Sequence, residues 1–149
     1  MGIFPTKILV AVDGSEEAGL AVEAAAELSR ATGSEVHIVH VLPREERLLA
    51  YHFYSEEMRE TIIERAEKEA RSFLEEQAQR ISSEGGKVAE THLRVDHPDK
   101  EIVRLAEVLE VGTIVMGNRG MGALSRALMG SVSESVVRHA HCPVYIMRR

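Results

Sequence analysis

Glycine spacing between residues 117 and 131 is the feature of this sequence best suited to chemistry. Gly117 and Gly120 are separated by two residues, and nine more residues lead to the pair Gly130-Ser131. Glycine lets a backbone approach a ligand closely and adopt positive φ angles that other residues avoid. A loop of this kind, directly after a strand and before a helix, is suited to holding a phosphate group by its backbone amides.

The helix expected after this loop would add further donors. Ser131, Val132 and Ser133 would begin that helix, where amides have no partner inside the helix and the dipole is positive. Arg119 would add a full positive charge within the loop. The simpler alternative is a flexible loop in which Gly117 ends a strand and Ser131 caps a helix.

Two hydrophobic patterns alternate along the chain and would position this loop. Short β-branched and aliphatic runs predict strands over 6–12, 35–41, 87–95, 113–116 and 143–147. Apolar residues at helical spacing predict helices over 16–32, 56–84, 98–110 and 131–140. Such alternation predicts an α/β fold with a doubly wound parallel sheet, in which ligands bind beyond the carboxyl ends of strands where the strand order reverses.

Composition excludes several classes of partner and location. The net charge of −6 gives no general attraction to nucleic acid or anionic lipid, so an anionic ligand would need a local set of donors. No apolar run approaches the roughly 18 residues of a membrane-spanning helix, and the N-terminus does not resemble a signal peptide. Cys142 is the only cysteine and cannot form an internal disulfide. We therefore expect a cytosolic protein.

Five segments follow one another along nearly the whole chain: KILVAVDGSEEA, VHIVHVLP, EIVRLAEV, TIVMGNRGMG and GSVSESVVRHAHCPVYIM. Together with the glycine spacing, they resemble the ATP-binding branch of the universal stress protein family. The resemblance implies one domain over 1–149, with a five-stranded parallel sheet in order 3-2-1-4-5 and helices on both faces. It also implies a homodimer formed through the C-terminal strand, which would pair with the same strand of a second subunit.

The resemblance assigns positions in this chain to a bound adenine nucleotide. Those expected around the adenine and ribose are Val12, Asp13, Val41 and Met116. Those expected around the phosphates are Gly117, Arg119, Gly120, Gly130, Ser131, Val132 and Ser133. The Asp13 carboxylate would accept from nucleoside hydroxyls or help to hold Mg²⁺, or Mn²⁺, with the triphosphate. A turn and cap role for Asp13 is compatible with either.

The function implied is that of an ATP-binding regulator in stress responses. Slow ATP hydrolysis or self-phosphorylation is an alternative, with His40 and His97 as weak candidates for a proton acceptor. A nucleotide-free dimeric interaction module of the same fold is a second alternative. The sequence leaves the preference among ATP, ADP and cyclic nucleotides open, as it does the protein partner.

Two positions depart from the family pattern. His97 stands in Val95-Asp96-His97-Pro98, where family members often have Gly-x-Pro, and Gly112 stands where they often have Asp before the fourth strand. A surface turn is the expected role of His97. For His139 and His141 we expect contacts at a helix end rather than a metal site.

The segment Tyr51-His52-Phe53-Tyr54 concentrates aromatic residues in the connection before the long helix. We expect it to pack beneath a long loop, and a lid over the adenine side or a partner surface is the alternative.

Overall fold

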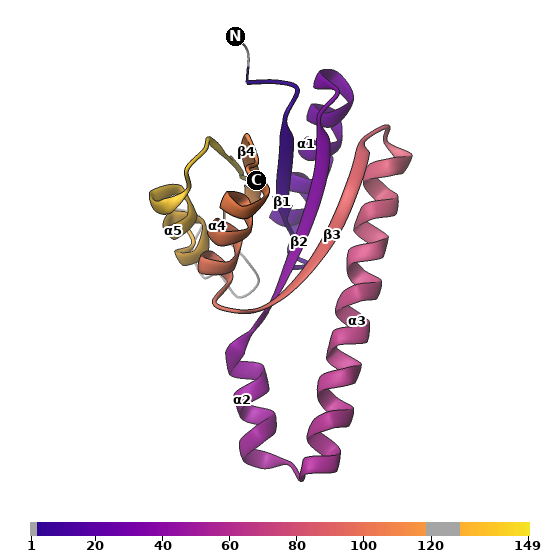
Figure 1. The fold of residues 1–149 in the computed structure, drawn as a ribbon, viewed down its shortest axis with the longest axis vertical. Coiled ribbons are helices and arrows are strands. Elements are labelled where there is room, and N and C mark those ends of the chain that lie inside the picture. The colour runs from indigo at the N-terminus through magenta and orange to yellow at the C-terminus, as the bar shows by residue number, and fades with distance from the viewer. Residues whose placement is uncertain (1–2, 119–128) are drawn as a thin grey trace.

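A five-stranded parallel sheet forms the centre of the molecule (Figure 1). The computed structural model describes residues 3–118 and 129–149. The strand order is β3-β2-β1-β4-β5, which confirms the predicted doubly wound topology. The strands are β1 (Lys7–Ala11), β2 (Glu35–Pro43), β3 (Lys87–Asp96), β4 (Thr113–Gly117) and β5 (Val144–Met147).

Helices cover both faces of the sheet, and each face has its own apolar cluster. On one face lie α1 (Glu16–Thr32) and α3 (Glu56–Ser83), whose Ala21, Ala25 and Leu74 pack with strand residues. On the other face lie α4 (Pro98–Leu109) and α5 (Ser131–His139), which supply Ile102, Leu105 and Val136. The central strands are therefore buried from both sides, as expected for parallel strands rich in aliphatic residues.

Local sequence signals explain where the helices begin and end. The Ser15 hydroxyl caps α1 by accepting a hydrogen bond from the Ala18 amide at 3.1 Å, and Ser55 caps α3 in the same way. Gly33 ends α1 with a left-handed φ of 76°. Pro98 begins α4, where the missing amide hydrogen costs nothing.

A further helix, α2 (Arg44–Phe53), replaces the connection expected from the sequence. The prediction that Tyr51, Phe53 and Tyr54 pack beneath a loop is wrong, since these side chains are 56%, 75% and 46% exposed. Figure 1 shows α2 and the first half of α3 projecting beyond the sheet. We call this pair of segments, residues 44–69, the arm.

The helices of the arm are held to each other rather than to the sheet. Arg47 forms an ion pair with Glu67, and the Arg59 guanidinium lies 5.0 Å from the centre of the Tyr51 ring. The buried residues of α3 are Ala70, Leu74, Ala78 and Ile81, all beyond residue 69. Contacts between α2 and α3 therefore hold the arm together, and no described residue of α2 belongs to either apolar cluster.

A β-bulge interrupts the pairing of β2 with β3. Val36 pairs with Val88 but His37 pairs with Glu90, so Ala89 is an extra residue in β3. Because side chains alternate along a strand, one extra residue exchanges the faces of all that follow. Val88 and Leu93 consequently pack against the same apolar cluster, although they are an odd number of positions apart.

No helix in the described ranges 3–118 and 129–149 is both long and apolar enough to cross a membrane.

Candidate functional site

The carboxyl ends of β1 and β4 lie side by side where the strand order reverses. From β1 the chain continues to β2 on one side, whereas β4 pairs with β1 on the other. Ligands of open parallel sheets bind at such a point, because the connecting segments diverge there and leave a crevice. The structure thus brings Asp13 and Gly117 to the same edge of the sheet.

The end of β1 is a hydrogen-bonded turn. The Val12 amide donates to the Val39 carbonyl at 2.9 Å, and the Ser15 amide donates to Asp13 Oδ1 at 2.9 Å. His40 Nδ1 lies 2.8 Å from the Val12 carbonyl oxygen, where a ring hydrogen would donate. These bonds fix the backbone around Asp13 and leave its side chain exposed at the sheet edge. The turn role expected for Asp13 is confirmed.

The end of β4 is packed against the first turn of α1. A Cβ atom placed on Gly117 would lie 2.9 Å from the carbonyl carbon of Glu17 and 3.0 Å from the amide nitrogen of Ala18. Glycine is required at this position because the neighbouring backbone comes too close for a side chain. Val41 and Met116 belong to the buried cluster beneath this edge, so only a small part of either side chain would face a ligand.

Asn118 connects β4 to three other segments at the base of the site. Its backbone amide donates to the Met147 carbonyl at 2.9 Å and to the Glu17 carboxylate at 3.0 Å. Its backbone carbonyl accepts from the Gly130 amide at 3.0 Å. Asn118 Oδ1 is buried and has no hydrogen-bond partner in the described part of the chain. A buried acceptor of this kind suits a site that receives a donor group.

The start of α5 supplies amides to the same edge. Gly130 occupies the N-cap position without a side-chain cap, so Ser131, Val132 and Ser133 present the first three amides of the helix. The alternative in which Ser131 caps the helix is wrong. The Ser133 hydroxyl is buried and donates to the carbonyls of Asn118 and Gly130. Its hydroxyl hydrogen is therefore already used within the protein.

Arg119 and Gly120 lie outside the described residues, so their predicted contacts with phosphate stay predictions. The site also contains two residues that sequence reasoning missed, Glu17 and Asn118. In the sequence, Glu17 was recognisable only as an acidic residue in the first turn of a predicted helix. Asn118 follows Gly117 directly within the glycine pattern, and that adjacency was the available signal.

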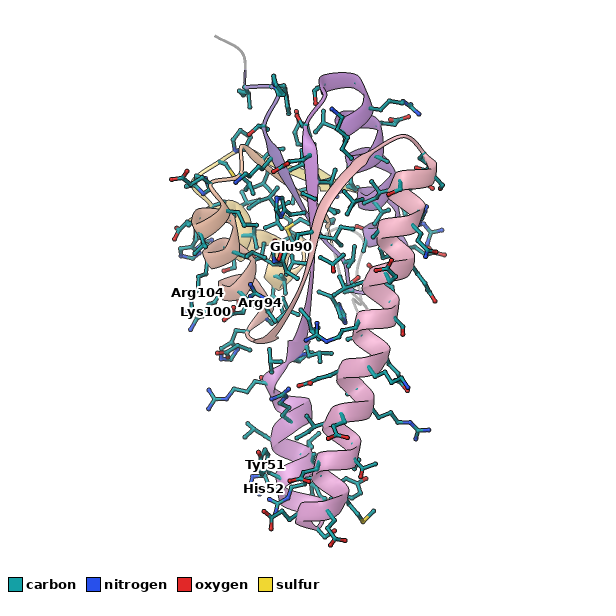
Figure 2. The ribbon with its side chains drawn as sticks, turned by 45° about the vertical axis from the view of Figure 1, so that its right-hand side comes forward. Tyr51, His52, Glu90, Arg94, Lys100 and Arg104 are labelled. Carbon is teal, nitrogen blue, oxygen red and sulfur yellow. The ribbon has the colours of Figure 1, made fainter. Side chains whose placement is uncertain are left out.

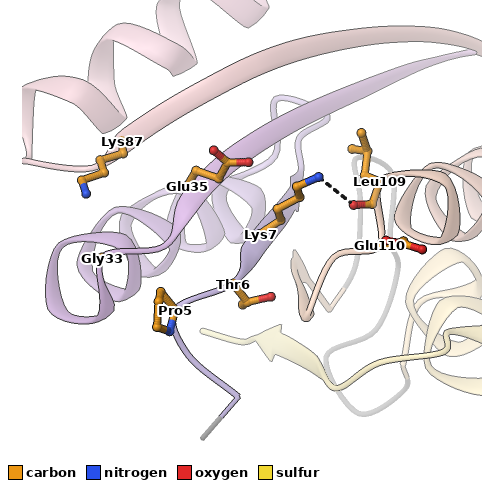
Figure 3. A pocket seen from close by; sticks show the side chains of 8 residues that line it. All are labelled: Pro5, Thr6, Lys7, Gly33, Glu35, Lys87, Leu109 and Glu110. Carbon is orange, nitrogen blue, oxygen red and sulfur yellow. Dashed lines mark hydrogen bonds between the residues drawn. The ribbon is translucent and has the colours of Figure 1, made fainter.

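A hollow at the opposite end of the sheet is separate from this site (Figure 3). It lies at the amino ends of β1, β2 and β3, and Lys7, Glu35 and Lys87 are among its lining residues. Lys7 Nζ is already used there, because it donates to the Leu109 carbonyl at 3.2 Å.

The other residues singled out in the sequence have roles outside the crevice. His97 is exposed at the start of α4, in agreement with the turn expected there. His139 Nδ1 is 2.9 Å from the Ser135 carbonyl, and His141 Nε2 is 3.0 Å from the Val111 carbonyl. Gly112 is explained by packing, since a Cβ atom there would lie 2.2 Å from Thr6 Oγ1.

Comparison with known proteins places this architecture in a family. The family model described as "Universal stress protein family" matches residues 5–148. The chain belongs to the universal stress protein family. Universal stress protein YxiE of Bacillus subtilis is 34% identical over 146 residues, which cover 95% of this chain and 98% of that protein.

Two solved structures resemble this universal stress protein over nearly its full length. Protein MJ0577 is 30% identical with a TM-score of 0.83, over 96% of this chain and 95% of that one. A universal stress protein from Archaeoglobus fulgidus, solved in complex with dAMP, is 31% identical with a TM-score of 0.69. That match covers 97% of this chain and 99% of the relative.

Proposed function

We propose that this universal stress protein binds ATP with Mg²⁺ or Mn²⁺ in the crevice between the ends of β1 and β4. Binding would regulate the affinity of a homodimer for a protein partner during stress. The observation that carries the proposal is the position of the α5 amides and the Asp13 carboxylate at the one edge where the strand order reverses. A nucleotide has phosphate groups that can accept hydrogen bonds from these amides, and ribose hydroxyls that can donate to this carboxylate.

The start of α5 suits a phosphate chain. The amides of Ser131, Val132 and Ser133 have no intrahelical acceptor and lie at the positive end of the helix. Gly130 carries no side chain that would block their approach, and Gly117 brings β4 close to α1 behind them. Arg119 and Gly120 are proposed as further phosphate contacts.

Asp13 suits the nucleoside and the metal. Its exposed carboxylate can accept hydrogen bonds from ribose hydroxyls or provide an oxygen ligand to Mg²⁺. The cation would supply positive charge between Asp13 and the phosphates, which otherwise repel each other. Val12, Val41 and Met116 are proposed to form the apolar surface against which adenine lies.

The Archaeoglobus fulgidus relative supports an adenine nucleotide as the ligand class, because it was solved with dAMP. We propose ATP in preference to a monophosphate because the spacing of Gly117, Gly120 and Gly130-Ser131 resembles that of the ATP-binding branch of the family. A nucleotide-free dimeric module is the competing function. The observation that disfavours it is the buried Asn118 Oδ1, which has no hydrogen-bond partner among the described residues. The cytosolic location expected from the sequence stays a prediction.

The test is mass analysis of nucleotide released from freshly purified protein, followed by calorimetric titration of the emptied protein with Mg-ATP. We expect copurified adenine nucleotide and a single binding event. Gly130→Val should abolish binding, since the added branched side chain would stand before the α5 amides while its backbone φ of −68° tolerates valine.

Ser131→Ala is the matched control. It removes an exposed hydroxyl one residue away but keeps the amide, so binding should persist. Absence of binding up to millimolar Mg-ATP, or equal binding by the parent and Gly130→Val, would contradict the proposal.

A further inference from the structure

Two buried histidines meet between β2 and β3, away from the nucleotide crevice. His37 Nδ1 and His92 Nε2 are 3.0 Å apart, and the two side chains are only 7% and 6% exposed. Glu90 Oε2 lies 3.8 Å from His92 Nε2. One ligand atom from each of the three residues can be chosen so that all lie within 4.8 Å of one another. Three such groups at this separation are suited to share one ion.

The β-bulge at Ala89 builds this cluster. In the register before the bulge, His37 would face Ala89 across the strands, and Glu90 and His92 would point to the opposite face. Because of the extra residue, the side chains of Glu90 and His92 lie on the same face of the sheet as His37, which is the face covered by α4. Bulges recur at functional sites because they redirect side chains in this way.

A fourth residue orients the first histidine. Glu35 Oε1 lies 3.4 Å from His37 Nε2, so a hydrogen on Nε2 would donate to this carboxylate. That arrangement leaves a lone pair on His37 Nδ1, and His92 Nε2 becomes the donor across the 3.0 Å contact. Metal-ligating histidines are commonly held by a carboxylate on their other nitrogen.

We propose that His37 Nδ1, His92 Nε2 and the Glu90 carboxylate bind a divalent transition-metal ion of the Zn²⁺ class, with Glu35 orienting His37. Two imidazoles on one tetrahedral Zn²⁺, at about 2.0 Å each, place their nitrogens about 3.3 Å apart, close to the separation present here. The hydrogen on His92 Nε2 would move to Nδ1 when the ion enters. This change of tautomer exposes the second lone pair and releases no proton.

Charges and exposure around the cluster are compatible with this site. Glu35 and Glu90 contribute two negative charges, and Arg94 is the nearby cation that acts on His92. Figure 2 shows Glu90 and, further along β3, Arg94, which lies beside Lys100 and Arg104 of α4. The Glu90 side chain is 63% exposed, so this member of the cluster borders solvent while the two rings are buried. A filled site would join β2 to the edge strand β3 at the bulge.

Calorimetric titration of the full chain with ZnCl₂ tests the proposal, with the protein free of any affinity tag, treated with chelator and without added nucleotide. We expect one ion per chain. His92→Gln and Glu90→Gln should each weaken binding at least tenfold, and Glu35→Gln should weaken it by roughly 10- to 100-fold as the loss of an orienting partner does. Glu90→Gln changes an exposed side chain, so folding should be unaffected.

Two controls separate this site from the others. His97→Gln removes an exposed histidine at the start of α4 and should leave zinc binding unchanged, as should Gly130→Val in the crevice. With Cu²⁺ as probe, electron paramagnetic resonance should show coupling to two nitrogens in the parent and to one in His92→Gln. Zinc binding that survives both His92→Gln and Glu90→Gln, or no binding by the parent at 100-fold excess over micromolar protein, would overturn the proposal.

Discussion

The contact between Gly117 and the first turn of α1 determines how closely the two sides of the crevice approach. Replacing Gly117 by Ala would place a methyl group 2.9 Å from backbone and side-chain atoms of Glu17. Backbone cannot move as a flexible side chain does, so we expect a loss of about 1–3 kcal/mol in the free energy of unfolding. Urea denaturation measures this change, and nucleotide binding should weaken with it.

Gly19→Ala is the control for that substitution. Gly19 lies in α1, and among the described atoms its added Cβ would meet only Arg80 Nη1, at 3.6 Å. Alanine is favoured over glycine inside a helix, so this variant should gain about 0.4–1 kcal/mol. Equal effects from the two substitutions would show that the close contact at Gly117 is not what makes glycine necessary there.

Single residues of the candidate site differ in how readily sequence reveals them. The glycine pattern and the helix start after it were recognisable because spacing along the chain carries the signal. Glu17 and Asn118 were not, because their bond joins residues 101 positions apart. His37 and His92 are 55 positions apart, and only the bulge brings them to one face. Pairing across strands is a property of the fold rather than of either segment.

A hydroxyl-to-carboxylate bond ties α5 to α4 and allows a test at the level of the elements. The Ser135 hydroxyl donates to Asp99 Oδ2 at 2.7 Å. This bond lowers the pKa of Asp99, with the amides of Lys100 and Asp99 adding to the effect and burial opposing it. A carboxyl group with a lowered pKa stabilises the fold above its unfolded pKa, and the stabilisation is lost as pH falls through the folded pKa.

Ser135→Ala should therefore raise the pKa of Asp99 toward its ordinary value of about 3.9 and lower the stability of the fold above that pH, and the difference from the parent should vanish as the pH falls through the folded pKa of Asp99. Carboxyl-carbon NMR titration of Asp99 measures the shift. Ser135→Thr keeps the hydroxyl and should leave the pKa low. An Asp99 pKa that is the same in the parent and Ser135→Ala would contradict the assigned cause.

The elements show which signals sequence carries well. Of the ten elements in the described residues, nine were expected within a residue or two at each end. Helix-start residues such as the N-cap Ser15 and the first helical residue Pro98 mark these boundaries clearly. The element that the sequence did not predict was α2, because residues 44–53 resemble a polar connection that contains aromatic residues. This helix depends on contact with α3, as in the ion pair of Arg47 with Glu67. The sequence of residues 44–53 alone does not reveal that contact.

At the scale of the whole molecule, β5 ends the sheet and is the predicted dimer contact. The Pro143 carbonyl accepts from the backbone amide of Ile114 in β4 at 3.0 Å, and the Met147 carbonyl accepts from the backbone amide of Asn118, just after β4, at 2.9 Å. Alternate residues of a parallel strand bond to the same neighbour, so the backbone of Ile146 faces the free edge. A second copy of β5 would find its donors and acceptors there.

Ile146→Pro should convert the proposed dimer to a monomer, since it removes an outward amide while keeping the bonds to β4. Sedimentation equilibrium measures the assembly state. Ile146→Ala removes comparable side-chain packing but keeps the amide, so it should remain dimeric. A monomeric parent, or a dimer unaffected by Ile146→Pro, would exclude this edge as the interface.

Overall topology was the most predictable property of the molecule. Alternating strands and helices admit few right-handed arrangements, and the family resemblance selected the order that the structure has. The shape beyond the sheet was less predictable, because the arm is set by pairing between two helices and not by the apolar clusters.

The arm also divides the chain into parts that resist unfolding to different degrees. Ala50, 4% exposed, is the only buried apolar residue of α2 among those described, and the buried positions of α3 all lie in its second half. Regions with few buried apolar contacts open at a lower free energy than the core. We therefore expect residues 44–69 to open at a lower free energy than the sheet and the crevice at its edge.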